Sequence, residues 1–219
     1  MRIAVFGATG GIGRHVVERA LAAGHEVVAM ARDPAGAEPR ERLTFMAGDL
    51  ADPSAMARVV SGSDAVIWAV GPTSNTADQP PIFEQGARNL VGAMQSAGVK
   101  RLVALSGAGI TVAGERKPLA GRLMTGLVAV LAKHVVEAKR REYEVFSASE
   151  LEWTLARPPR VVEGPALGTY EAGDRLAGRT ITQADLAQFM VDQLADRSWL
   201  REAPFVSRRP SAGPGPRAT

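Results

Sequence analysis

The stretch FGATGGIGRHV, residues 6–16, places four glycines between an apolar segment and a helical pattern. The preceding segment, RIAVFG, has the continuous apolar character of a strand that is buried on both faces. The apolar residues that follow recur at the spacing of one helix face and stop before Gly24: Ile12, Val16, Val17, Ala20 and Leu21. The stretch therefore predicts a sharp turn from a buried strand into an amphipathic helix.

The glycines at positions 7, 10 and 13 give the spacing G-x-x-G-x-x-G, and Gly11 is an additional one. Such glycines permit a tight turn, a close approach of the main chain to a phosphate, and close packing of the helix on the sheet. The helix N-terminus favours a negative charge through its free N–H groups and its dipole. We predict that a dinucleotide coenzyme binds here; the alternative is a turn that needs glycine for its geometry alone. The predicted contacts are Gly7, Thr9, Gly10, Gly11, Ile12 and Gly13.

Five further short apolar runs, beginning at residues 26, 43, 64, 101 and 152, continue the pattern. Their alternation with amphipathic helical patterns is typical of β-α-β units around a parallel sheet. We expect a Rossmann-type, doubly wound α/β fold with the strand order 3-2-1-4-5-6. One of the expected helices is indicated by an apolar stripe that ends before Gly98: Phe83, Ala87, Leu90, Val91 and Met94.

We expect a single coenzyme-binding domain over residues 1–206, with a small substrate lobe at about 158–206 that is rich in Gly and Pro. Within this lobe, TQADLAQFMVDQLAD at 182–196 predicts one helix, with Thr182 as its N-cap and Asp185 three residues later. Residues 207–219 have no apolar periodicity and predict a disordered tail.

The composition argues against several kinds of site. The chain has no cysteine, and His15, His25 and His134 are not at ligand spacing, so we expect no disulfide and no metal site. The net charge is +3, but the basic residues are spread along the chain, and nucleic acid is not an expected partner. The apolar stretch at 123–132 is shorter than the roughly 20 residues needed to cross a bilayer. We expect no signal peptide, a cytoplasmic location and a small-molecule substrate, with both a monomer and a homodimer left open.

The end of the second apolar run favours one coenzyme over another. An NAD-binding protein usually places an acidic residue there to accept a hydrogen bond from the ribose 2′-hydroxyl. This chain reads VVAMARDP, with Arg32 close to the expected position. Because a guanidinium matches a 2′-phosphate in charge and geometry, we predict NADP(H) in preference to NAD(H). Alternatively, Arg32 is a surface residue that pairs with Asp33, which would leave the coenzyme preference open.

Further motifs carry a resemblance to a known superfamily. They are GDLADP at 48–53, AVGP at 69–72, GARNLVGAMQSAGVKRLVALSG at 86–107 and SELEWTLARPP at 149–159. Together with GATGGIG, they make the chain similar to an atypical short-chain dehydrogenase/reductase over about residues 1–206. It most resembles the NADPH-dependent flavin reductase/biliverdin-IXβ reductase group and related proteins with NmrA-like NAD(P)-binding domains.

The resemblance implies contacts to the coenzyme at three strand ends. The residues after the third strand would flank the adenine, those after the fourth would lie under the ribose and nicotinamide, and a proline after the sixth would lie against the nicotinamide ring. Each also has a structural alternative: the acid could cap a helix and the proline could make a rigid strand exit. The implied contacts are Asp49, Leu50, Val70, Gly71, Pro72 and Pro158.

The Tyr-x-x-x-Lys motif of the superfamily is incomplete in this chain. Lys139 aligns with the family lysine, which holds the ribose, but Val135 stands where the tyrosine is expected, and Tyr143 lies on the wrong side of the lysine. The family serine after the fifth strand corresponds to Gly107 here, and we expect Ser106, one position earlier, to face the nicotinamide. The family histidine after the two prolines corresponds to Arg160. Arg160 could attract an anionic acceptor or could equally be a solvent-exposed residue. The expected catalytic residues are thus Ser106, Lys139 and Arg160.

Without a phenol as general acid, reduction of a carbonyl to an alcohol loses about 10²- to 10⁴-fold in rate. Flavins, quinones and tetrapyrroles can delocalise the charge that hydride arrival leaves, and they can take a proton from solvent. We therefore predict NADPH-dependent reduction of a flat conjugated acceptor. The alternatives are a non-catalytic NADP(H)-binding sensor of the NmrA-like type, or an isomerase or dehydratase built on the same scaffold.

Overall fold

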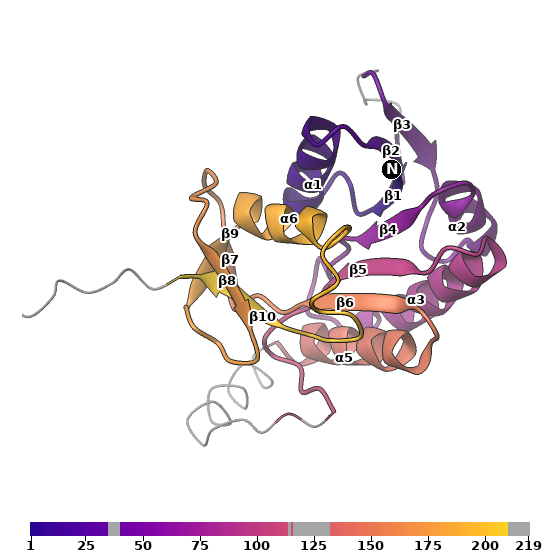
Figure 1. Cartoon of the computed structure of the whole chain (residues 1–219). Helices are drawn as coiled ribbons and strands as arrows, with labels where there is room; N and C mark the ends of the chain where they lie inside the picture. Colours follow the sequence, from indigo (N-terminus) through magenta and orange to yellow (C-terminus); the bar gives the residue numbers. More distant parts are fainter. Residues whose placement is uncertain (35–39, 114, 116–131, 210–219) are drawn as a thin grey trace, which may run out of the picture.

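The six apolar runs of the sequence form six strands in the computed structural model, which describes residues 1–34, 40–113, 115 and 132–209. The strands are β1 (Arg2–Phe6), β2 (Glu26–Ala31), β3 (Leu43–Ala47), β4 (Ala65–Trp68), β5 (Arg101–Leu105) and β6 (Glu152–Ala156). All neighbouring pairs are parallel, and the order is β3-β2-β1-β4-β5-β6, which confirms the predicted Rossmann-type arrangement (Figure 1).

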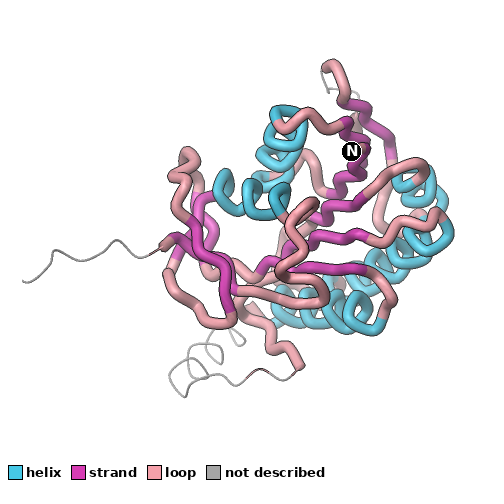
Figure 2. The backbone as a smooth tube through the Cα atoms, in the orientation of Figure 1, coloured by secondary structure: helices cyan, strands magenta, loops and turns pink. Residues whose placement is uncertain are grey.

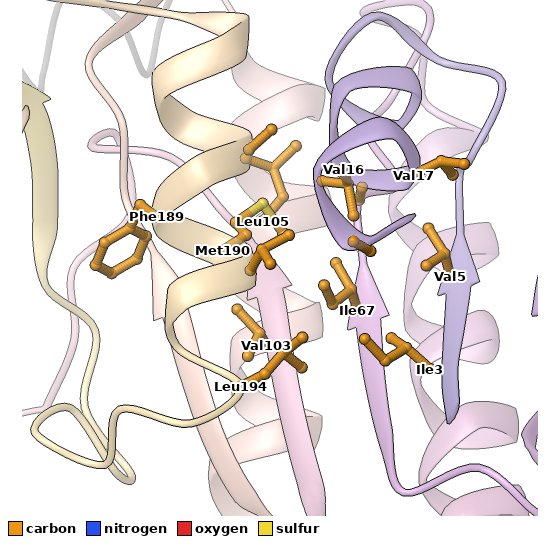
Figure 3. Close-up of a cluster of buried hydrophobic side chains, with 14 of the residues drawn as sticks. Ile3, Val5, Val16, Val17, Ile67, Val103, Leu105, Phe189, Met190 and Leu194 are labelled. Carbon is orange, nitrogen blue, oxygen red and sulfur yellow. The ribbon is translucent and has the colours of Figure 1, made fainter. Parts of the chain in front are cut away.

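Helices cover both faces of this sheet. On one face lie α1 (Gly11–Ala22) and α6 (Gln183–Asp192), and on the other lie α2 (Pro53–Val60), α3 (Gln79–Ser96) and α5 (Lys133–Ala148). Figure 3 shows the core on the face covered by α1 and α6, where Val16 of α1 and Met190 of α6 pack over strand residues such as Ile67. Each of these three side chains is fully buried, which explains the continuous apolar character of the strands.

Two helix starts agree with capping rules, and one of them corrects an alternative of the sequence analysis. Thr182 caps α6, as predicted, because its hydroxyl accepts a hydrogen bond from the Asp185 N–H at 3.0 Å. At α2, however, the N-cap is Asp52, whose carboxylate accepts from the main chain of Ser54 and Ala55. Asp49 is therefore not the helix cap that we considered; its carboxylate accepts from Ala51 N at 2.9 Å within the preceding turn.

The lobe after β6 contains four short strands that the sequence did not reveal. They are β7 (Arg160–Val162), β8 (Tyr170–Gly173), β9 (Thr180–Thr182) and β10 (Phe205–Arg208), with β7 parallel to β9 and β8 antiparallel to β10. These strands stand together beside α6, at the left of Figure 2. The expected tail boundary at Ser207 is wrong, because Ser207 is buried within β10 and pairs with Glu171. Residues 210–219 lie outside the described residues.

Main-chain hydrogen bonds join the lobe to the sheet. The segment that leads into β10 runs beside β6, and four bonds connect them: Arg201 N to Trp153 O, Leu155 N to Glu202 O, Arg157 N to Pro204 O, and Val206 N to Arg157 O. Because these bonds hold the two segments together, the lobe and the sheet strand β6 form one unit. Within the described part of the chain, no helix combines the length and the apolar character that a bilayer crossing requires.

Candidate active site

The glycine loop between β1 and α1 has the geometry that the sequence predicts. Gly7 has a φ of +80°, and a Cβ on Gly13 would lie only 1.9 Å from the carbonyl oxygen of Gly7. A side chain is therefore excluded at position 13 by the main chain itself. Gly10 is the N-cap of α1, and no side chain in the described residues caps this helix or places an acid in its first turn. The first-turn N–H groups are thus suited to an anion such as a diphosphate.

The predicted residues at the ends of four strands form one continuous edge. A Cβ on Gly7 would lie 2.7 Å from Ala69 O, so the glycine loop touches the end of β4. Beyond it, the chain that leaves β5 stays paired with the chain that leaves β6, because Ser106 N donates to Ala156 O at 2.8 Å and Ala108 N donates to Pro158 O at 2.9 Å. Ligands of open α/β sheets bind at such an edge, at the carboxyl ends of the strands.

Lys139 lies at the centre of this edge, but its contacts differ from those that the resemblance implies. Its ammonium donates to Val70 O at 2.6 Å and to Leu105 O at 3.0 Å, and it pairs with Glu142 Oε2 at 2.7 Å. These contacts use all three N–H donors, and Lys139 is buried. The geometry does not support the expected role of Lys139 in holding the ribose or in the chemical step. It instead fastens the ends of β4 and β5 to each other.

Glu142 and Trp68 complete this buried network, and the sequence analysis missed both. Glu142 Oε1 accepts from the Trp68 indole N–H at 2.6 Å, while Oε2 faces Lys139. Burial raises the pKa of the Glu142 carboxyl above its ordinary value, and the Lys139 ammonium and the indole N–H oppose that rise. The spacing of Lys139 and Glu142, three residues apart on one helix, was a visible signal for a pair.

Ser106 is buried at the end of β5, and its hydroxyl has no hydrogen-bond partner among the described residues. A buried hydroxyl without a partner is costly and calls for an explanation. A coenzyme that lies along this edge would supply the missing partner. Ser106 directly follows Leu105, whose carbonyl oxygen accepts from Lys139, and its own N–H pairs with the end of β6. The unpaired hydroxyl and the uncapped start of α1 both fit a dinucleotide at this edge.

The predicted adenine side lies at the ends of β2 and β3. Arg32 follows β2 and is exposed, as is Asp49 after β3. Leu50 is half-buried and packs against the core on the face covered by α2, α3 and α5. Its carbonyl oxygen accepts a hydrogen bond from Asn89 Nδ2 at 2.8 Å. Gly71 and Pro72 follow Val70 in the loop after β4. These residues share the edge with the glycine loop because β2 and β4 flank β1 in the sheet and β3 lies next to β2.

Two other residues that the sequence singles out, Arg160 and Tyr143, make no contact with this edge among the described residues. Arg160 is exposed at the start of β7. Tyr143 points elsewhere: its hydroxyl accepts from Ala113 N at 3.0 Å and its ring packs edge-on against Trp153. Tyr143 therefore cannot replace the phenol that is missing at Val135.

Arg157, at the start of RPP, is a structural residue that the sequence analysis overlooked. It is buried, lies 4.0 Å from the ring centre of Phe205, and donates to Glu115 Oε2 at 2.8 Å and to Ala203 O at 2.7 Å. It thereby holds the chain after β5 against the chain before β10. Of the segment 110–122 that follows β5, positions 114 and 116–122 lie outside the described residues.

Comparison with known families agrees with this geometry. The pattern of the family described as NAD(P)H-binding matches residues 7–197, from the first glycine of the loop to beyond α6. The chain belongs to this NAD(P)H-binding family. The match spans the glycine loop, the buried network and Ser106.

Three proteins illustrate how far the likeness to this NAD(P)H-binding chain extends. A solved protein from Burkholderia pseudomallei is 30% identical, with a TM-score of 0.74 over 94% of this chain and 99% of that one. Cinnamoyl-CoA reductase 1 from Oryza sativa subsp. japonica is 34% identical over 116 residues, which are 49% of this chain and 34% of the rice enzyme. The anaerobillin reductase ChuY from Escherichia coli O157:H7 shares the fold, with 18% identity and a TM-score of 0.75 over 98% of this chain and 100% of ChuY. The chain thus spans about a third of the length of the curated rice relative.

Proposed function

We propose that this NAD(P)H-binding protein is a reductase that uses NADPH in preference to NADH and reduces a flat conjugated small molecule, such as a flavin, a quinone or a tetrapyrrole. The observation that carries the proposal is the pairing of an unpartnered, buried Ser106 hydroxyl with the lack of a phenol at Val135. Such an edge can bind and orient a nicotinamide but offers little to protonate an alkoxide. The name of the structurally similar ChuY, an anaerobillin reductase, supports this acceptor class.

In this proposal, the residues of the chain act mainly by binding and orientation. The bound coenzyme would supply a hydride from its reduced nicotinamide. The N–H groups of the α1 start bind the diphosphate, Ser106 donates a hydrogen bond to the nicotinamide end, and Pro158 limits which ring face is exposed. Lys139 acts as a positioning residue, because it fixes the carbonyl groups of Val70 and Leu105 under the same end. The acceptor takes its proton from solvent, and the protein acts in the cytoplasm.

The direct test follows the loss of reduced-nicotinamide absorbance when the purified protein is mixed with NADPH and FMN, a quinone or biliverdin. We expect turnover with at least one of these acceptors and little with simple aldehydes or ketones. Turnover confined to aldehydes and ketones would contradict the proposed acceptor class.

The coenzyme preference is tested at Arg32, which is exposed at the end of β2. Arg32→Glu replaces a donor to the 2′-phosphate with a repelling charge. Hydrogen bonds to charged groups contribute about 1.5–3 kcal/mol, so the Kd of NADPH should rise by about 10- to 100-fold. The Kd of NADH should change little. Arg88→Glu, the same charge reversal on the exposed outer side of α3, serves as the control. Equal weakening of both coenzymes by Arg32→Glu would refute the assignment.

A second candidate function is a coenzyme-binding sensor without turnover, in the manner of some NmrA-like proteins. The observation that favours it is Lys139, because all three of its donors are used inside the protein and none is left for the chemistry. Tight binding of NADPH with no acceleration for any acceptor would support the sensor over the reductase.

A further inference from the structure

Gly11 is the one glycine of the loop that the spacing G-x-x-G-x-x-G does not require, and the structure gives it a neighbour. A Cβ on Gly11 would lie 2.7 Å from Gln183 Nε2 and 3.1 Å from Gln183 Cδ. Gln183 is the first residue of α6 and comes from the lobe end of the chain. Its carboxamide therefore lies directly against the main chain at the first residue of α1.

The start of α6 is held firmly in this position. The Thr182 hydroxyl accepts from Asp185 N and donates to Asp185 Oδ2, both at 3.0 Å. The same carboxylate accepts from the main chain of Leu167 and Gly168, which ties the lobe to the helix start. Asp185 is 2% exposed, so its charge is already engaged and turned away from solvent.

The carboxamide of Gln183, in contrast, is half-buried and makes no hydrogen bond to any described residue. An amide has two N–H donors and one oxygen acceptor to offer. Held next to the uncapped start of α1, it adds a donor to a place where the helix N–H groups already favour an anion. Neither helix start presents a free carboxylate there in the described residues, since α1 has none and that of α6 is engaged.

We propose that Gln183 is a coenzyme-positioning residue that donates a hydrogen bond from its carboxamide to the diphosphate of the bound dinucleotide. A side chain at position 11 would displace this carboxamide from the start of α1. The lobe then contributes to the coenzyme site, and binding of the coenzyme strengthens the packing of α6 on α1. The inference rests on the coenzyme half of the proposed function and is independent of the acceptor.

The test compares coenzyme affinity in three proteins by titration calorimetry with NADP⁺: the wild type, Gln183→Glu and Gln188→Glu. Gln183→Glu replaces a donor with an anion beside the diphosphate, and the Kd should rise by at least about tenfold. Gln188→Glu is the matched control: it makes the same change on the same helix, where the side chain faces Arg19 and Asp192 and not the glycine loop. Its Kd should stay within about twofold of the wild type.

A thermal melt without coenzyme separates this effect from loss of the fold. A Glu at the first position of a helix favours the dipole, so Gln183→Glu should melt no lower than the wild type while it binds the coenzyme more weakly. Adding NADP⁺ should raise the melting temperature of the wild type more than that of Gln183→Glu. Equal affinities of the wild type and Gln183→Glu would overturn this inference alone. Absence of binding by the wild type would overturn the proposed function with it.

Discussion

The edge of the sheet is shaped in two different ways, one at the end of β1 and the other at the ends of β4 and β5. At the end of β1, only main-chain atoms decide the geometry: Gly7 and Gly13 approach each other so closely that no side chain fits. At the ends of β4 and β5, a buried ion pair decides it, since the Lys139 ammonium holds two carbonyl groups and Glu142 neutralises the ammonium. The geometry at the end of β1 depends on the absence of side chains on Gly7 and Gly13. The geometry at the ends of β4 and β5 depends on two buried charges, each of which compensates the other.

This difference predicts how each end fails. A buried charge that loses its partner remains in the core at a high cost, whereas a clash in the main chain displaces a loop at the surface. We therefore expect the largest effect on stability at the buried pair, a smaller one at the glycine loop, and the smallest where similar charges are exposed.

Lys139→Met should have the largest effect. It leaves the Glu142 carboxyl, which is almost fully buried, without its cation, and breaking such a pair costs about 3–5 kcal/mol. The free energy of unfolding, measured by urea denaturation near neutral pH, should fall by this amount.

The double variant Lys139→Met/Glu142→Gln is the control for this prediction. It removes both charges but keeps an acceptor for the Trp68 indole N–H. Because replacing a whole buried pair is often nearly neutral, the double variant should regain much of the lost stability. A single variant as stable as the wild type would show that the pair is not what holds these strand ends.

Gly13→Ala should have an intermediate effect. Its Cβ would lie 1.9 Å from Gly7 O, so the loop must shift, at a cost near the upper end of the range of about 1–3 kcal/mol for overpacking. The shifted loop should also lose measurable NADP⁺ binding in calorimetry. Gly92→Ala is the matched control, because a Cβ there meets no described atom within 4 Å and Gly92 lies in α3. It should stabilise the protein by about 0.5–1 kcal/mol. If both alanines had the same effect, the main-chain explanation for Gly13 would fail.

Glu137→Gln should have the smallest effect and shows what burial adds. Glu137 lies on α5, like Glu142, but on the exposed side, where hydrogen bonds from Arg140 and Arg141 lower the pKa of its carboxyl from 4.5 to about 2. A lowered pKa stabilises the folded state above pH 4.5, and this part is lost as the pH falls towards 2. Solvent-exposed pairs contribute less than about 1 kcal/mol, so the change in unfolding free energy at neutral pH should be small.

The pH dependence distinguishes this surface pair from the buried one. Between about pH 5 and pH 3, the stability of Glu137→Gln should fall less steeply than that of the wild type. About 1 M NaCl should remove most of this difference, because salt screens exposed charges. A difference that persists in salt would mean that Glu137 is coupled to buried groups.

The glycine loop and the Lys139 network also differ in how much the sequence reveals. The roles of Gly7 and Gly13 follow from their spacing alone, since only glycine avoids a clash with the main chain at these positions. The role of Lys139 does not, because it depends on Trp68 and on the burial of Glu142, which come from separate elements. Helix spacing shows that Lys139 and Glu142 share a face of α5, but it does not show that this face is buried.

The lobe was harder to predict for a different reason. Its strands have three or four residues each, too few for a clear alternation of polar and apolar side chains. The strand β10 includes Ser207 and Arg208, which have the composition of the tail that follows them. Gln183 gave no signal as a site residue, because its position beside Gly11 depends on how α6 packs against α1.

The four main-chain bonds between residues 153–157 and residues 201–206 also limit how the molecule can move. A hinged domain opens by rotation about a few free torsions, and here such a rotation would first have to break these bonds. Entry of a ligand between the sheet edge and the lobe should therefore require no rigid-body swing of the lobe. We expect association rates governed by diffusion and charge, without a slow opening step.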